Sequence, residues 1–350
     1  CARRKGGGKA PALITSIDSE LQIFAYSLLE GLGRSCICAA NAATGEILAL
    51  ASRHGEEDLD VNQFSARFEH YKTMESGFLT EPWRGALPIG STAKIMTLLA
   101  MLHADIPLDW TDKTGIYKDI HNANKTAGGV MNEASAAVAS SNTYFAHGAD
   151  AAGFDHMTWA QEYLGMNSGR FCFESVPLKA SGLNTDSSNA EVLQQAIGQG
   201  TLQASCLVPM VQFGCLASGR LVNRLFTAKK LEDTLPDGTV ETEWLNEEPD
   251  ILVRDAVEMD RLRSVFAQVA KAYKLTLAAE GAEVFAKTGT AQLSTGRYAT
   301  YLPFAIRYKD GHSYMAIVFR ENCQETSSAL KPAARELLAK MNALHSRWEK

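Results

Sequence analysis

The sequence predicts a mixed α/β fold, in which strands from both ends of the chain flank a block of helices and loops. Near the start, Cys36–Asn41 and Glu46–Ala51 have the length and apolar character of two strands joined by a tight turn. From about residue 55 to residue 255 the spacing is mainly that of helices and loops. Three further strand-like stretches follow: Glu283–Lys287, Leu302–Tyr308 and Ser313–Phe319.

Helices are predicted where apolar residues recur every three or four positions. Asp18–Gly31 and Leu207–Ala217 have this pattern, and Lys331–Arg347 predicts a closing helix with Pro332 in its first turn. One more stripe predicts an amphipathic helix before the last strands. It consists of Met259, Leu262, Phe266, Val269, Ala270 and Tyr273.

Two segments are predicted to lie outside this framework. Residues 1–12 are basic and glycine-rich, which is typical of a flexible linker. Lys229–Pro249 is acidic and contains the turn signal Pro236-Asp237-Gly238, which predicts a solvated surface loop. Residues 13–350 are then expected to form the catalytic domain.

The composition indicates one soluble enzyme domain. Of the 350 residues, 46% are hydrophobic and 21% are charged, as is usual in globular enzymes. The formal net charge of -6 argues against nucleic acid as a partner. No stretch approaches the roughly eighteen consecutive apolar residues that a membrane span needs. The seven cysteines are predicted to be mostly buried free thiols, and no Cys/His spacing indicates a zinc site.

Three short segments carry most of the chemical information. They are Ser91-Thr92-Ala93-Lys94, Ser140-Ser141-Asn142 and Lys287-Thr288-Gly289-Thr290. On a helix, a lysine three residues after a serine lies on the same face, and it can take the serine's proton if it is neutral. Burial or a nearby positive charge would lower the pKa of Lys94, and Lys287 is a candidate for that charge. Together the segments predict a serine acyl-transfer site.

Ser91 is predicted to lie at a helix N-terminus. Pro88-Ile89-Gly90 breaks any earlier element, and a buried helical stripe follows Ser91. Free N–H groups at such an end favour negative charge on a reacting oxygen. The alternative is that Ser91 is only an N-cap residue. Because all three segments occur in order, the nucleophile is the favoured interpretation.

In this order the segments resemble those of the penicillin-binding protein transpeptidase domain, most closely the monofunctional class B type. These serine D,D-transpeptidases cross-link bacterial peptidoglycan and are acylated by β-lactam antibiotics. The similarity covers roughly residues 13–320. Besides the motifs, the segments that carry it are Ile14–Asp18 with Leu21-Gln22, Thr44–Leu50, Asp60–Phe64, Pro88–Ser91, Ser141–Phe145 and Ala196–Gly200.

The resemblance implies a five-stranded antiparallel sheet flanked by terminal helices, with an all-helical lobe beside it and the active site between the two. The sheet lobe would comprise about residues 13–54 and 256–350, and the helical lobe about residues 55–255. It also implies an extracytoplasmic enzyme, anchored to the membrane through a segment absent from this chain.

The resemblance further implies a role for each motif residue in acyl transfer. Ser91 would attack the carbonyl of the terminal D-Ala-D-Ala bond, and Lys94 would take its proton. Ser140 would relay a proton towards the leaving amine, and Asn142 would hold the amide of the substrate. The acyl group would then pass to an amine on a neighbouring stem peptide, or to water.

The third motif would bind the end of the substrate. Lys287, Thr288 and Thr290 would hold the terminal carboxylate, and Gly289 would leave room for the substrate backbone. The backbone N–H groups of Ser91 and Thr290 would form the oxyanion hole. No cofactor or metal is implied. The implied partners are peptidoglycan stem peptides and β-lactams, with other cell-wall synthesis proteins as further candidates.

Several functions share these motifs. A D,D-carboxypeptidase differs only in sending the acyl group to water. A β-lactamase would need a group that activates water, and no convincing Glu-x-x-x-Asn segment lies between the second and third motifs. A non-catalytic β-lactam sensor or scaffold is a further alternative. The chain also lacks the family's usual tryptophan-phenylalanine pair after Thr290, and Tyr301 and Phe304 are interpreted as core or strand residues.

Overall fold

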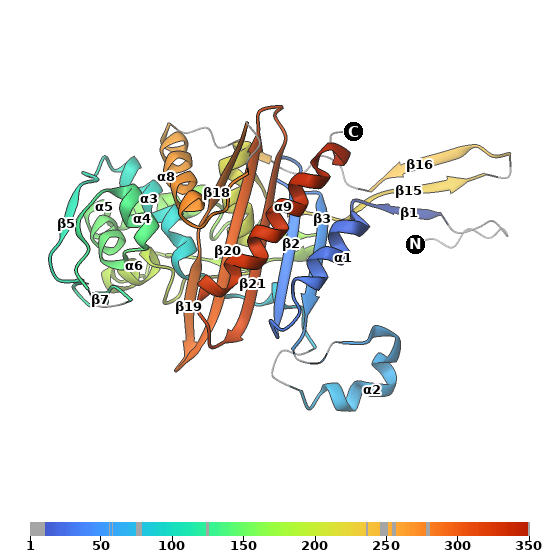
Figure 1. The fold of residues 1–350 in the computed structure, drawn as a ribbon, viewed down its shortest axis with the longest axis horizontal. Coiled ribbons are helices and arrows are strands. Elements are labelled where there is room, and N and C mark those ends of the chain that lie inside the picture. Colours follow the sequence, from blue (N-terminus) through green and yellow to red (C-terminus); the bar gives the residue numbers. More distant parts are fainter. Residues whose placement is uncertain are drawn as a thin grey trace.

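A central antiparallel sheet joins strands from the two ends of the chain (Figure 1). The computed structural model describes residues 11–348, apart from residues 56, 58, 75–78, 124, 125, 236, 246–250, 254–256 and 278–280. The strands of this sheet are β2 (Ser35–Asn41), β3 (Ile47–Arg53), β18 (Ala282–Ala286), β19 (Gly289–Ser294), β20 (Arg297–Tyr308) and β21 (Ser313–Cys323). Their order is β18-β20-β21-β2-β3, and β19 also pairs with β20.

The edge of the sheet beside β20 is made by two strands in succession. β18 pairs along the second half of β20, where Ala286 lies opposite Phe304. β19 pairs along the first half, where Gly289 lies opposite Tyr301. The described sheet is therefore five positions wide, as expected, although it contains six strands. The edge changes from one strand to the next at residues 287–288, inside the third motif.

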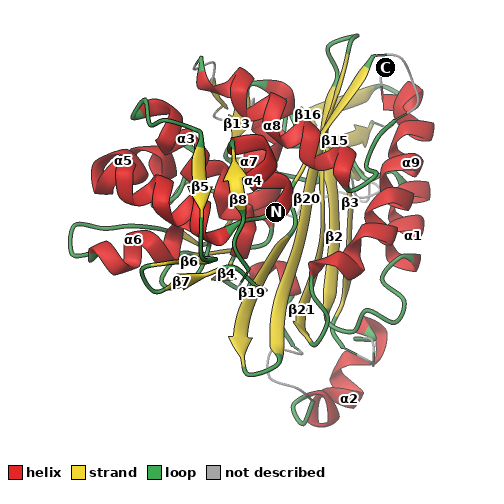
Figure 2. Cartoon of the chain, turned by 60° about the vertical axis from the view of Figure 1, so that its left-hand side comes forward, coloured by secondary structure: helices red, strands yellow, loops and turns green. Residues whose placement is uncertain are grey.

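Helices cover both faces of the sheet (Figure 2). α1 (Ser19–Ser27) and α9 (Lys331–Trp348) lie on one face, and α7 (Leu207–Ser218) and α8 (Glu258–Ala272) lie on the other. Because both faces are covered, the central strands are buried along continuous runs instead of at alternate residues. The apolar run Cys36–Ala40, which has no exposed residue, follows from this arrangement.

A group of helices packs beside the sheet, formed by α3 (Lys94–His103), α4 (Glu133–Ala139), α5 (Asn142–Tyr163) and α6 (Asn189–Ala196) (Figure 1). The expectation of an all-helical lobe is wrong, because this part of the chain also contains strands of two or three residues, too short to give an alternating pattern. The short strands are β4 (Leu87–Pro88), β5 (Trp110–Asp112), β6 (Ile116–Tyr117), β7 (Ile120–His121), β8 (Gly129–Met131), β9 (Cys172–Phe173), β10 (Val176–Pro177), β11 (Ala180–Ser181), β12 (Gln203–Ala204), β13 (Arg220–Val222), β14 (Arg224–Leu225) and β17 (Ile251–Val253).

A second sheet extends away from the body of the molecule (Figure 1). It consists of β1 (Ala12–Thr15), β15 (Ala228–Thr234) and β16 (Val240–Trp244), in the order β1-β15-β16. The prediction of a surface loop over 229–249 is therefore wrong for much of that segment. Its mostly charged and polar residues form a half-buried strand, β15, and an exposed strand, β16. The predicted linker overlaps β1 at Ala12, and residues 1–10 lie outside the described residues.

The predicted helices are confirmed with small changes in their ends. Asp18 caps α1 by accepting a hydrogen bond from the Leu21 N–H, and α7, α8 and α9 lie where the apolar stripes predicted. The remaining elements are α2 (Phe64–Tyr71), η1 (Val61–Gln63), η2 (Pro82–Arg84), η3 (Gly90–Ala93) and η4 (Ser327–Leu330), where η denotes a 3₁₀ helix.

None of the described cysteines forms a disulfide, and most are buried, as predicted. Tyr301 and Phe304 are fully buried in β20, which confirms them as core residues. In the part of the chain that the structure describes, no helix has both the length and the apolar character needed to span a membrane.

Candidate active site

Ser91 lies in the 3₁₀ turn η3, which runs directly into α3. The N-cap positions of η3 and α3 are Ile89 and Ala93, and neither side chain caps its helix. Ser91 is therefore not an N-cap residue. Its hydroxyl instead accepts a hydrogen bond from the Ser140 hydroxyl, with 3.0 Å between the two oxygens.

The nucleophile turn is in backbone contact with β19. Gly90 has a φ of +55°, and a Cβ built there would lie 2.6 Å from the carbonyl oxygen of Thr290. A Cβ at Gly289 would lie 2.6 Å from the carbonyl oxygen of Ile89. The space beside Gly289 is thus filled by the nucleophile turn, whereas we expected it to admit a substrate backbone. The contact brings the backbones of Ser91 and Thr290, the predicted oxyanion-hole residues, close together.

Lys94 is completely buried and uses its ammonium group to join the first two motifs. Its Nζ donates to the carbonyl oxygen of Ser140 at 2.7 Å, to Oδ1 of Asn142 at 2.8 Å and to Oγ of Ser140 at 3.2 Å. Burial, and secondly the charge of Lys287, hold the pKa of Lys94 well below its usual value of 10.5. This agrees with the requirement for a neutral lysine as base, and with the predicted influence of Lys287.

Ser140 is the meeting point of the three motifs. It lies between α4 and α5 with a left-handed backbone, φ 54° and ψ 39°, which is uncommon for a residue other than glycine. Its Oγ is 3.0 Å from Oγ of Ser91, 3.2 Å from Nζ of Lys94 and 2.9 Å from Nζ of Lys287. One hydroxyl therefore contacts the predicted nucleophile and both predicted cations.

Lys287 is also fully buried, and it lies at the break between β18 and β19. Besides Ser140, its Nζ donates to the carbonyl oxygen of Thr288 at 3.2 Å and to the hydroxyl of Tyr273 at 3.5 Å. Burial lowers the pKa of Lys287, and the neighbouring Tyr273 opposes that shift.

Thr288, directly before β19, and Thr290, within β19, both line the cleft. The Thr288 hydroxyl lies 2.8 Å from the Tyr273 hydroxyl. The Thr290 hydroxyl donates to Oγ of Ser327 at 2.8 Å and accepts from the Ser327 N–H at 3.1 Å. Ser327, from η4, therefore holds Thr290 in place.

A cavity of about 840 Å³ opens over these groups. Its lining includes Ser91, Ser140, Asn142, Thr288 and Thr290 from the predicted site. Further wall residues are Asn122, Ala123, Thr126, Ala127, Gly128, Met131, Gln199, Gln292, Tyr298, Thr326, Ser327 and Ser328. Lys94 and Lys287 lie buried beneath the serines. All eight predicted site residues thus lie at one cleft or directly beside it.

A buried polar network fixes the second motif. Oδ1 of Asn122 accepts from the Asn142 N–H at 2.9 Å and the Thr143 N–H at 3.2 Å, at the start of α5. Its Nδ2 donates to Asp112 at 2.8 Å, and Asp112 also accepts from the Thr143 hydroxyl at 2.7 Å. Nδ2 of Asn142 donates to the carbonyl oxygen of His121 at 3.0 Å, which leaves Oδ1 directed at Lys94.

Residues 35–339 match the family model described as the penicillin binding protein transpeptidase domain. The chain belongs to this family. Among curated proteins, the peptidoglycan D,D-transpeptidase MrdA of Acinetobacter baumannii is 28% identical over 233 residues, which is 58% of this chain and 33% of that protein. The chain thus spans about one third of the length of this relative.

Solved penicillin-binding proteins share the fold. PBP2 of Pseudomonas aeruginosa, in complex with WCK 5153, has a TM-score of 0.72 and 25% identity, over 94% of this chain and 78% of that one. Penicillin-binding protein A of Mycobacterium tuberculosis, solved as a ceftriaxone acyl-enzyme complex, has a TM-score of 0.78 and 16% identity, over 94% and 79% of the two chains. These similarities confirm the predicted fold class.

Several groups in this penicillin-binding protein site were not predicted from the sequence. Tyr273 was assigned only to an apolar helical stripe, and nothing in that pattern shows that its hydroxyl reaches the third motif. Asn122 and Ser327 lie far in sequence from the residues they hold. The hydroxyl-rich run Thr326-Ser327-Ser328 is the one signal that could have drawn attention to η4.

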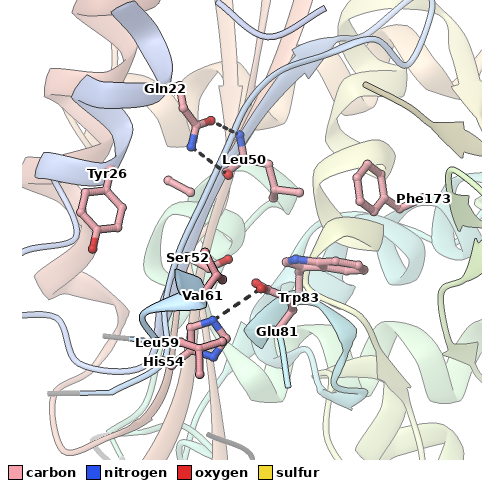
Figure 3. A pocket seen from close by; sticks show the side chains of 11 residues that line it. Gln22, Tyr26, Leu50, Ser52, His54, Leu59, Val61, Glu81, Trp83 and Phe173 are labelled. Carbon is pink, nitrogen blue, oxygen red and sulfur yellow. Dashed lines mark hydrogen bonds and ion pairs between the residues drawn. The ribbon is translucent and has the colours of Figure 1, made fainter. Parts of the chain in front are cut away.

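A second cavity of about 460 Å³ lies away from the motifs, between α1, β3 and η2 (Figure 3). Its polar groups are paired with one another: Gln22 accepts from the Leu50 N–H at 2.8 Å and donates to the Leu50 carbonyl at 3.0 Å, and His54 pairs with Glu81. Gln22 thus occupies the outer edge of β3 as a neighbouring strand would, which protects that edge.

Within the described part of this penicillin-binding protein, no group of three or more His, Cys, Asp or Glu side chains could hold a metal ion.

Proposed function

We propose that this chain is a serine D,D-transpeptidase domain, in which Ser91 is acylated by the D-Ala-D-Ala end of a peptidoglycan stem peptide. The observation that carries the proposal is the contact of one hydroxyl, that of Ser140, with Ser91, Lys94 and Lys287. The family membership and the similarity to MrdA support it.

The hydrogen bonds suggest how the proton leaves Ser91. When Lys94 is neutral it has two N–H donors. The two acceptors nearest to it, the backbone carbonyl oxygen of Ser140 and the side-chain Oδ1 of Asn142, cannot donate. Its lone pair then faces the Ser140 hydroxyl. Ser140 can pass its proton to Lys94 while it receives the proton of Ser91, so that Ser91 attacks as an alkoxide.

The same hydroxyl can serve the leaving group. After the attack Lys94 is an ammonium and donates to Oγ of Ser140, whose proton is then directed towards the cleft. Transfer of that proton to the leaving D-alanine nitrogen, with return of a proton from Lys94, breaks the amide bond and leaves an acyl ester on Ser91. No proton is gained or lost over the step.

The third motif suits the charged end of the substrate. Lys287 supplies a buried cation, and the hydroxyls of Thr288 and Thr290 lie at the cleft. A terminal carboxylate bound there would place the preceding carbonyl near Ser91. The N–H groups of Ser91 and Thr290 would then stabilise the oxyanion, since the contact of Gly90 and Gly289 holds their backbones together.

The acyl group would pass to an amine of a second stem peptide, which gives a cross-link. This activity would require the domain to lie outside the cytoplasmic membrane, and β-lactams would act as inhibitors that acylate the same serine. Anchoring to the membrane and contacts with other cell-wall synthesis proteins belong to the same proposal. So do the division into a sheet lobe (13–54 and 256–350) and a lobe from 55 to 255, and the linker over residues 1–12.

The first test is the intact mass of the protein after incubation with a penicillin. We expect one stable adduct on the native chain and none on Ser91→Ala. Ser264→Ala, at an exposed position of α8, is the matched control and should be acylated normally. No adduct on the folded native protein would contradict the proposal, and rapid turnover to penicilloate would indicate a β-lactamase.

Cross-linking and hydrolysis are separated by a second measurement. A stem-peptide donor is supplied with and without an amine acceptor, and the products are identified by mass. A transpeptidase gives the amide product when the acceptor is present. Release of the tetrapeptide acid alone would indicate a D,D-carboxypeptidase. Acylation without either product would indicate a sensor or scaffold.

A further inference from the structure

Tyr273 connects α8 to the third motif. It is the C-cap residue of α8, its side chain is only 6% exposed, and its hydroxyl lies 2.8 Å from the Thr288 hydroxyl and 3.5 Å from Nζ of Lys287. Two residues from the first turns of α9 also contact Tyr273. Nζ of Lys331 lies 4.2 Å from the centre of the Tyr273 ring, and Nε of Arg335 donates to its carbonyl oxygen at 3.1 Å.

The directions of these hydrogen bonds follow from the chemistry of the groups. A lysine ammonium can only donate, so the Tyr273 oxygen accepts from Lys287. The single phenol proton is then available to the Thr288 oxygen. Thr288 also has a single hydroxyl proton, and this one remains free to point into the cleft that Thr288 lines. Without the phenol, the Thr288 proton could rotate away from the cleft.

We propose that Tyr273 is a positioning residue that orients the Thr288 hydroxyl as a donor towards the cleft, and thereby selects ligands that carry a terminal carboxylate. The inference rests on the proposed function, because it assumes that Thr288 binds the carboxylate end of the substrate. A carboxylate only accepts hydrogen bonds, so a site of fixed donors favours it over a neutral ester, which accepts more weakly.

The electrostatics agree with this arrangement. Burial alone would raise the pKa of Tyr273, but its pKa is lowered, and the largest opposing contribution is the positive charge of Lys287. A phenol of this kind is a stronger hydrogen-bond donor than an ordinary tyrosine. Its contacts with Lys331 and Arg335 leave the ring little freedom to turn away.

The test compares two ligands that differ only at the carboxylate. A penicillin and its methyl ester are each reacted with the native protein and with Tyr273→Phe, and the second-order rate of acylation of Ser91 is followed by intact mass. We expect the variant to react about tenfold more slowly with the free acid, and within about twofold of native with the ester. The preference for the acid over the ester should therefore fall by at least about fivefold.

Two further variants make the result specific. Tyr308→Phe removes a phenol that bonds Asn342 outside the cleft, and it should retain the native preference. Thr288→Val should lose the preference for the acid, and adding Tyr273→Phe to it should cause no further loss, because the phenol acts through Thr288. If Tyr273→Phe folds poorly, Thr288→Val alone still tests the inference, because an unchanged preference for the acid in that variant would overturn it.

The possible failures are distinguishable. If Tyr273→Phe slows both ligands equally, or if the losses of the two variants simply add, Tyr273 has a general structural role and the inference is overturned. If the native protein reacts equally with acid and ester, the carboxylate does not bind at Thr288, and the inference falls while acylation stands. If neither ligand acylates the native protein, the proposed function is wrong, and the inference that rests on it is wrong as well.

Discussion

Ser140 combines an unusual backbone with a central chemical position. A left-handed conformation costs a serine about 1 kcal/mol, and it persists here because the residue closes α4 while Ser141 caps α5. This backbone carries Oγ to the point where two lysines and Ser91 meet. Strain at a single residue thus assembles groups from three parts of the chain.

At the same scale, Lys287 is expected to set the pH dependence of acylation. Lys94 accepts a proton only when neutral, so the rate should rise with pH through the pKa of Lys94. Lys287→Gln removes a cation that lowers this pKa, so the rising limb of the pH–rate profile should move to higher pH. Lys287→Arg keeps the charge and should keep the limb in place. The measurement is the second-order rate of penicillin acylation across a pH series.

This prediction is decided by the pH at which the rate rises and not by the maximal acylation rate, since Lys287 is also proposed to bind the substrate. Lys271→Gln, at an exposed position of α8, is the control for removing one positive charge. An identical limb in the native protein and in Lys287→Gln would show that Lys287 does not influence the base.

At the scale of elements, the contact between η3 and β19 determines whether the two motifs can act together. Gly90 also donates its N–H to the Gly198 carbonyl at 2.9 Å, in the glycine-rich stretch 196–200. Three backbone segments therefore converge beside Ser91. Side chains at these glycines would separate elements that must touch for an oxyanion hole to form.

Gly289→Ala tests this contact. Its Cβ would lie 2.6 Å from the Ile89 carbonyl oxygen and 2.8 Å from Cγ2 of Thr92, so β19 should move away from the nucleophile turn. We expect acylation to slow by at least about tenfold, since the loss of one oxyanion donor alone costs a hundredfold or more in other enzymes. Gly85→Ala is the control, because the nearest atom to its Cβ beyond the neighbouring residues would be the Pro82 carbonyl oxygen, at 3.8 Å. A native rate in Gly289→Ala would contradict the proposed oxyanion hole.

The sequence predicted long elements and missed those that depend on distant partners. The apolar runs of β2 and β20 and the stripe of α8 are local patterns, and they were recognised. The strands β15 and β16 were missed, because β15 is only half-buried, β16 is exposed, and both carry little apolar alternation. The catalytic motifs were predicted from spacing and resemblance. Tyr273 and Asn122 were not, since no spacing links them to Thr288 and Asn142.

At the scale of the whole molecule, the buried lysines should affect stability. Lys94 and Lys287 bind protons less readily in the folded chain than in the unfolded one, because burial lowers their pKa values. The unfolded state therefore binds more protons, and the free energy of unfolding should rise with pH through the lowered pKa values towards 10.5. The buried thiols of Cys38 and Cys206 have raised pKa values and act in the opposite direction near pH 9.

The informative window thus lies on the alkaline side of neutrality and below pH 9, where the thiols of the unfolded chain are still mostly protonated. Urea unfolding across it should show a positive slope of the free energy of unfolding for the native protein and a smaller slope for Lys94→Met. Lys271→Met, at an exposed lysine, should retain the native slope. Equal slopes in all three proteins would mean that Lys94 keeps its proton in the folded state throughout this range.

The order of strands in the central sheet has a consequence for synthesis. β2 pairs with β21, and Ser35 meets Arg320, so the first hairpin must wait for nearly the whole domain before it gains its inner neighbour. At ribosomal rates of about 5–20 residues per second, that interval is on the order of tens of seconds. During it the nascent β2–β3 pair exposes an open apolar edge, which favours chaperone binding or export in an unfolded form. Reactivity of Ser91 would then appear only after the last strands dock, so penicillin labelling would report the end of folding.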